Sequence, residues 1–271
     1  MKQNFFDFNL VKKEWQVFSI IATISGFIFM FIEIDRTTKI YILASFILGF
    51  GLIYIILYLY FKFWSNHINI QIGKVNLNIK VGDIFEEKGM KVIPVNEYFD
   101  TKVDDIIISQ NSLHGMFVKK YIINNDLKKL NSNIKERLEG HKYEENTERK
   151  NGKKKKYKIG TTLIVDNYIL TALTKFNEKN EAYLSMNEYL SFLNIFWNEI
   201  NHIHNGRVIN VPVLGTGISR INPALSEQEF LEQIVLSLKT SELITSKSKI
   251  NIIIYRGNKE KISLVKIKDK F

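Results

Sequence analysis

Three short segments combine glycine with polar residues in a pattern that suits an anionic ligand. In Val81-Gly82-Asp83-Ile84, an acid follows a strand-like run and can accept a hydrogen bond from an exocyclic amine. Leu113, His114, Gly115 and Met116 open a helical run, and the first amides of a helix can bind an anion. Gly215-Thr216-Gly217-Ile218 ends an apolar strand in a turn where bare backbone can approach a phosphate. Each segment alone is also typical of an ordinary turn after a strand.

Acid–base chemistry has three candidate residues near the second segment. A hydrolase could use His114, Asp100 or Glu97 as general acid or base, although an isolated histidine at a helix start is more often structural. The chain has no cysteine, which excludes disulfides, thiolate metal sites and cysteine nucleophiles. We expect a ligand-binding site with no catalytic residues, no metal and no bound cofactor, and a hydrolase stays open as the alternative.

An α/β sheet would bring these segments together, because ligands bind beyond the carboxyl ends of its strands. Apolar side chains alternate along residues 68–72 and 75–81, which is strand periodicity. Further strand-like runs are 91–95, 157–165, 168–173, 207–214, 250–255 and 262–267. Helical runs fall between them at 114–123, 127–138, 186–203 and 226–238. Ser226 and Glu229 form a capping box for the last helix. The pattern predicts a layered domain with a mixed sheet.

Two long apolar runs precede this domain. Residues 17–34 carry one charge, Glu33, near the end, and residues 40–61 carry none. A helix needs roughly 20 residues to cross the hydrocarbon layer, so both runs predict membrane-spanning helices joined by a short polar turn. We therefore expect a transmembrane hairpin over residues 1–66 and an α/β domain over residues 67–271. A buried core hairpin is the alternative.

Basic residues give the expected orientation of the hairpin. Lys12 and Lys13 precede the first run, while Lys62 and Lys74 follow the second. Because lysine and arginine favour the cytoplasmic side, we expect a multi-pass protein of the bacterial plasma membrane with both termini in the cytoplasm.

A lysine-rich insertion over residues 141–156 is the least patterned part of the chain. A solvated loop explains it, and attraction to anionic lipid headgroups is the functional alternative. The formal net charge of +10 favours an anionic partner without identifying it. The insertion lacks the interleaved aromatic residues of a single-strand binding platform, so no nucleic-acid partner is expected.

The order of these motifs resembles the macro domain, the fold that binds ADP-ribose. Asp83 and Ile84 match its adenine-reading strand end, and residues 94–98, including Asn96, look like its next conserved strand. Residues 215–218 look like its second phosphate loop, whereas the triple-glycine first loop is replaced by residues 112–115. The variant segments 95–101, 157–162 and 211–220, together with the hairpin, look like the membrane-anchored macro-domain effectors of the Thoeris antiphage system.

This resemblance implies that a partner TIR-domain enzyme consumes NAD and makes an ADP-ribose-derived messenger, histidine-ADP-ribose. It implies that the macro domain is a sensor and no enzyme. Binding of the messenger would then drive homo-oligomerisation and membrane disruption, ending in abortive infection. The ligand-binding residues that it implies are Asp83, Ile84, Asn96, Leu113, His114, Gly115, Met116, Gly215, Thr216, Gly217 and Ile218. Two alternatives stay open: a membrane-bound ADP-ribosyl hydrolase, and a passive module that recruits ADP-ribosylated partners.

Overall fold

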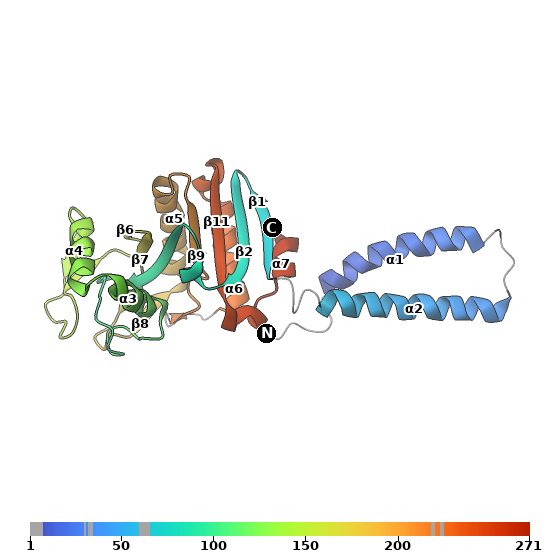
Figure 1. The fold of residues 1–271 in the computed structure, drawn as a ribbon, viewed down its shortest axis with the longest axis horizontal. Coiled ribbons are helices and arrows are strands. Elements are labelled where there is room, and N and C mark those ends of the chain that lie inside the picture. The colour runs from blue at the N-terminus through green and yellow to red at the C-terminus, as the bar shows by residue number, and fades with distance from the viewer. Residues whose placement is uncertain (1–7, 30, 32–34, 60–65, 218–219, 223–224) are drawn as a thin grey trace. The chain divides into compact units, whose positions relative to one another are not determined.

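The protein was analysed as a computed structural model that describes the chain except residues 1–7, 30, 32–34, 60–65, 218–219 and 223–224. The chain forms two compact units (Figure 1). One comprises residues 1–68 with residues 260–270, and the other comprises residues 69–259 with Phe271.

A nine-stranded mixed sheet forms the centre of the larger unit. Its order is β1-β2-β11-β9-β3-β7-β8-β10, with β6 paired to β7. The five strands β2, β11, β9, β3 and β7 run parallel to one another, whereas β6 and β8 run antiparallel to β7. The strands are β1 (His67–Ile72), β2 (Val75–Gly82), β3 (Met90–Asn96), β6 (Thr162–Val165), β7 (Tyr168–Phe176), β8 (Ala182–Ser185), β9 (Val208–Pro212), β10 (Ile221–Asn222) and β11 (Ser248–Tyr255).

Helices cover the sheet because its central strands are apolar on both sides. In β3, Ile93 and Val95 pack into a buried cluster with Phe117 of α3 and Leu130 of α4. Val92, which points to the opposite face by strand alternation, is fully buried as well. The helices on the first face are α3 (Leu113–Asn124) and α4 (Leu127–Leu138), and a second pair comprises α5 (Met186–Ile203) and α6 (Glu227–Lys239).

The second helical pair is joined by packing and by one buried hydrogen bond. The Trp197 indole of α5 donates to Ser237 Oγ of α6 at 2.9 Å, and the rings of Tyr189 and Phe230 meet edge to face. The capping box of Ser226 and Glu229 is confirmed at the start of α6, and the apolar stripe of α5 is buried. Short 3-10 helices complete the fold: η2 (Ile84–Glu86), η3 (Glu242–Thr245) and η4 (Arg256–Lys261).

The smaller unit contains a helical hairpin. Helices α1 (Phe8–Phe29) and α2 (Arg36–Leu59) lie side by side (Figure 1), with the rings of Phe18 and Phe50 5.0 Å apart. Asp35 ends the turn, where its carboxylate accepts a hydrogen bond from Thr38 N at 3.0 Å and caps α2.

Helix α2 alone among the described helices is long and apolar enough to span a bilayer, whereas α1 has a shorter apolar segment, Phe18–Phe27. Two spanning helices are therefore not confirmed. Positions 30 and 32–34 of the first expected run, with residues 60 and 61 of the second, lie outside the described residues.

The end of the chain differs from the expected strand over residues 262–267. Leu264–Lys270 form helix α7, and Val265 packs with Tyr54 and Tyr58 of α2. The expected strand over residues 157–165 also divides, because Lys155–Tyr157 (β5) pair with Tyr143–Glu145 (β4) in a separate ribbon.

Candidate functional site

The carboxyl ends of the parallel strands form one edge of the sheet. Gly82 at the end of β2 is level with Tyr255 of β11, and Pro212 at the end of β9 is level with Ile253. Asn96 ends β3, which runs parallel to β9. The segments after β2, β9 and β3, which the sequence singled out, therefore meet at this edge.

Asp83 caps the short helix that follows β2. Its Oδ1 accepts a hydrogen bond from Phe85 N at 2.9 Å, while Ile84 is buried beneath the turn. Among the described residues, no second hydrogen bond reaches the Asp83 carboxylate. One oxygen therefore holds the turn, and the other can accept a donor from a ligand.

The turn after β9 divides into a packed half and an open half. Gly215 has φ +94°, and a Cβ there would lie 2.8 Å from the Phe230 ring, so this glycine is required by packing. Thr216 Oγ1 donates to Val213 O at 2.8 Å. Gly217 is exposed, and a Cβ there would meet nothing within 4 Å. Ile218 lies outside the described residues.

The start of α3 is held tightly against the preceding loop. Ser112 Oγ accepts a hydrogen bond from Gly115 N at 3.0 Å, so this amide is capped. A Cβ on Gly115 would lie 2.2 Å from Ser109 O, which only glycine permits. Leu113 packs against the core, while Met116 is 39% exposed. The amides of Leu113 and His114 are the early helix amides left for an anion.

The His114 ring faces the loop after β3. It is buried, and its Nε2 lies 3.0 Å from Asp100 O. Burial lowers the pKa of His114 to about 4, so the ring is neutral at physiological pH. A neutral ring that hydrogen-bonds a carbonyl oxygen must carry its proton on Nε2.

The side-chain amide of Asn96 has a hydrogen-bonded oxygen and an unpaired nitrogen. Its Oδ1 accepts hydrogen bonds from Tyr98 N at 3.0 Å and Asp100 N at 3.3 Å. Its Nδ2 is buried and finds no hydrogen-bond partner among the described residues. Leaving a buried donor unpaired costs about 1–3 kcal/mol, so a ligand oxygen at Nδ2 would restore the missing bond.

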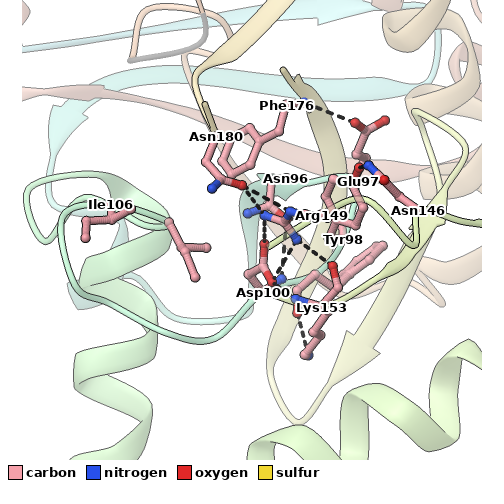
Figure 2. A network of polar contacts seen from close by, with 12 residues as sticks. Asn96, Glu97, Tyr98, Asp100, Ile106, Asn146, Arg149, Lys153, Phe176 and Asn180 are labelled. Carbon is pink, nitrogen blue, oxygen red and sulfur yellow. Dashed lines mark hydrogen bonds and ion pairs between the residues drawn. The ribbon is translucent and has the colours of Figure 1, made fainter. Parts of the chain in front are cut away.

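A buried ion pair that the sequence analysis did not predict lies beside Asn96 (Figure 2). Arg149 Nη2 donates to Asp100 Oδ2 at 2.8 Å, and both side chains are almost fully buried. Lys153 N donates to Asp100 Oδ1 at 2.8 Å, and Lys153 Nζ donates to Phe99 O at 2.6 Å. The expected solvated or lipid-facing insertion is thus packed inward at Arg149 and Lys153, while Lys154 and Lys155 are exposed.

The three acid–base candidates already have hydrogen-bond partners within the protein. Asp100 is occupied by Arg149, and Glu97 Oε1 accepts a hydrogen bond from Phe176 N at 3.0 Å. Burial raises the pKa of Glu97 and lowers that of Lys153 to about 8. The part of the chain that the structure describes holds no group of three or more residues able to bind a metal ion. The free polar groups described at this edge, on Asp83 and Asn96, are suited to hydrogen-bonding a ligand.

A separate cavity of about 550 Å³ lies between the β4–β5 ribbon and α5. Glu97, Lys156, Tyr157 and Lys175 are among its lining residues, and Lys175 is paired with Glu188 at 2.5 Å. Tyr157, which the sequence predicts to lie on a strand, is on β5 and lines this cavity.

Comparison with known proteins places this chain in a family. Residues 77–255 match the family model described as Thoeris protein ThsA, Macro domain. The Thoeris protein ThsA of Bacillus amyloliquefaciens (strain Y2) is 33% identical over 258 residues, covering 93% of this chain and 86% of that protein.

Solved structures of the Oceanobacillus iheyensis macrodomain are similar at lower identity. A mutant with ADPR is 14% identical with a TM-score of 0.45, covering 75% of this chain and 98% of that one. The same macrodomain with ADP is 13% identical with a TM-score of 0.44, covering 75% and 96%. On the family model and the ThsA relative, this chain belongs to the Thoeris ThsA family, and residues 77–255 are its macro domain.

Proposed function

We propose that this protein is an antiphage defence effector whose macro domain binds an ADP-ribose-derived messenger. Family membership supports the defence role, and the edge where Asp83, Asn96 and Gly217 meet supports the ligand class. The observation that carries the proposal is the pair of unused polar groups at this edge: the second carboxylate oxygen of Asp83 and the buried Nδ2 of Asn96.

The messenger would lie along the carboxyl edge. Asp83 accepts a hydrogen bond from the adenine amine above Ile84, and the amides of the 215–218 turn hold the diphosphate, where Gly217 leaves room for a phosphate. Asn96 Nδ2 donates to a ribose hydroxyl, and residues 113–116 meet the distal end. Histidine-ADP-ribose made by a partner TIR-domain enzyme is the proposed messenger.

The hairpin would anchor the protein in the bacterial plasma membrane. Helix α2 has 24 residues and so rises about 36 Å, enough for the hydrocarbon layer. Leu48 is 74% exposed and Leu52 60% exposed, which is costly in water and favourable in lipid. Helix α1 would cross beside it, with both termini in the cytoplasm. Messenger binding would favour a homo-oligomer whose clustered hairpins disrupt the bilayer.

Asp83→Ser separates ligand binding from helix capping. Serine can still cap η2 through Phe85 N but lacks the second carboxylate oxygen. We expect about tenfold weaker binding of ADP-ribose and histidine-ADP-ribose, the loss of one charge-assisted hydrogen bond. Isothermal titration of the full-length protein in detergent measures the affinities.

Asp126→Ser is the matched control, because Asp126 caps α4 in the same way, with Oδ1 accepting from Lys129 N at 2.6 Å. It should leave both affinities unchanged. Equal binding by the Asp83→Ser variant and the wild type would remove the adenine assignment. Release of ADP-ribose from a modified substrate by the wild type would assign a hydrolase instead.

A further inference from the structure

The insertion between α4 and β6 carries a buried arginine whose polar contacts all point inward. Arg149 is 9% exposed. Its Nη2 donates to Asp100 Oδ2 at 2.8 Å, and its Nη1 donates to Asp100 Oδ1 at 3.3 Å. Asn180 Oδ1 accepts two further hydrogen bonds, from Nε at 3.0 Å and from Nη2 at 2.8 Å. The Nη1 atom also donates to Lys153 O at 2.6 Å. The guanidinium lies 3.8 Å from the centre of the Tyr98 ring (Figure 2).

The turn that carries Arg149 is built around this side chain. Gly152 has φ +95°, and a Cβ there would lie 2.7 Å from Arg149 Nη1, so the backbone closes directly on the guanidinium. Asn146 Nδ2 donates to the Tyr98 hydroxyl at 2.9 Å. The segment 146–153 is therefore a strap across the loop that follows β3.

Asp100 connects this strap to the candidate ligand site. Its side chain accepts from Arg149, its backbone carbonyl contacts His114 Nε2, and its amide donates to Asn96 Oδ1. Two predicted ligand residues are thus fixed through the residue that the arginine holds. A bidentate arginine–carboxylate pair imposes a fixed geometry, which lysine cannot reproduce.

We propose that Arg149 is a positioning residue for messenger binding, acting through Asp100 to hold Asn96 and His114 in the geometry that receives the ligand. This inference rests on the proposed function. It gives the basic insertion a role inside the macro domain, in place of one at the lipid surface.

The test compares two neighbouring cations of the strap in the full-length protein. Arg149→Met removes the hydrogen bonds that hold Asp100, whereas Lys150→Met removes one positive charge from an exposed position. Titration with ADP-ribose and histidine-ADP-ribose should show at least tenfold weaker binding for Arg149→Met and an unchanged affinity for Lys150→Met. Equal losses in the two variants would mean that charge alone matters and would overturn the proposal.

A double variant separates positioning from simple destabilisation. Loss of one partner of a buried ion pair leaves the other charge uncompensated, but apolar replacement of both restores stability. Arg149→Met with Asp100→Leu should melt at a higher temperature than the single Arg149→Met variant, although Lys153 N loses its acceptor, while its affinity stays at least tenfold weaker than that of the wild type. Recovery of affinity together with stability would reduce the pair to a structural role.

Hydrogen exchange tests, without any ligand, the clamp, by which we mean the hold of Arg149 on Asp100. In both the single Arg149→Met variant and the double variant, amides of residues 97–115 should exchange faster than in the wild type, and Lys150→Met should leave them unchanged. If the wild type binds neither ADP-ribose compound but this exchange pattern is found, the clamp stands and the proposed ligand is wrong. Unchanged exchange in the Arg149→Met variant would overturn the clamp itself.

Discussion

The buried ring of His114 is a titratable group at the site whose protonation affects stability. Burial is the main cause of its lowered pKa, and nearby Lys153 lowers it further. The Asp100 carboxylate and its backbone carbonyl oppose this, because both favour the imidazolium. Acid must therefore charge a ring that the fold holds neutral.

Stability should fall as the pH drops from 6.5 towards 4. In this window the unfolded chain binds a proton at His114 that the folded state excludes, so the free energy of unfolding decreases by about 2 kcal/mol between pH 7 and pH 5. Urea unfolding of the full-length protein, followed by the fluorescence of buried Trp197, measures it. His114→Gln should remove most of this pH dependence and His141→Gln should keep it; the same slope in the His114→Gln variant would contradict the assignment.

Some residues of the candidate site could be predicted from the sequence, and others could not. Asp83 could be placed at a strand end because glycine and alternation give a local signal. Arg149 could not be distinguished from the exposed cations around it, because its partner Asp100 lies 49 residues earlier in the chain. A buried pair between distant segments leaves no local pattern, although Gly152 nearby was a hint of a tight turn.

At the scale of elements, periodicity and caps predicted helices best. The expected helices at 127–138 and 186–203 have those bounds in α4 and α5. The segment from Ile262 to Ile267 was predicted wrongly because a short apolar run satisfies strand and helix alike. Its buried residues Leu264, Val265 and Ile267 lie on helix α7.

Gly115 in the first turn of α3 and Gly217 in the turn after β9 differ in the space available for a side chain. Alanine normally stabilises a helix relative to glycine. Gly115→Ala should instead destabilise the macro domain by about 1–3 kcal/mol, because the added Cβ would clash with the Ser109 carbonyl. Gly217→Ala should leave stability unchanged, since space is open there, and weaken phosphate binding.

Urea unfolding and ligand titration of the two glycine variants, measured side by side, give both quantities. A Gly115→Ala variant that is as stable as the wild type would show that the loop at Ser109 moves freely away from the helix. Wild-type affinity in the Gly217→Ala variant would move the phosphates away from this turn.

At the scale of the whole molecule, the chain divides into a hairpin unit and a macro domain. From composition the sequence predicts a division at residue 66, because residues 40–61 lack any charge while the remainder is rich in lysine. The observed units differ from that expectation in placing residues 260–270 with the hairpin. The first span is not confirmed, because the apolar segment found among the described residues of α1 is Phe18–Phe27.

The absence of native cysteine makes the proposed topology directly measurable. Thr37→Cys, in the first turn of α2, should react with a membrane-impermeant maleimide in intact cells. Lys150→Cys, in the strap, should react only after the membrane is opened. Reaction of both residues, or of neither, in intact cells would contradict a hairpin with cytoplasmic ends.

The connectivity of the sheet places both ends of the larger unit near one edge of that sheet. A two-residue turn joins β1 to β2, so β1 runs antiparallel and starts near the edge where β2 and β11 end. The chain passes between its two units at Ile68 and again at Lys259, a few residues from that edge. Both ends of the larger unit thus lie close to the edge that carries the candidate ligand turns, so a change in those turns can reach both ends of this unit without crossing the sheet.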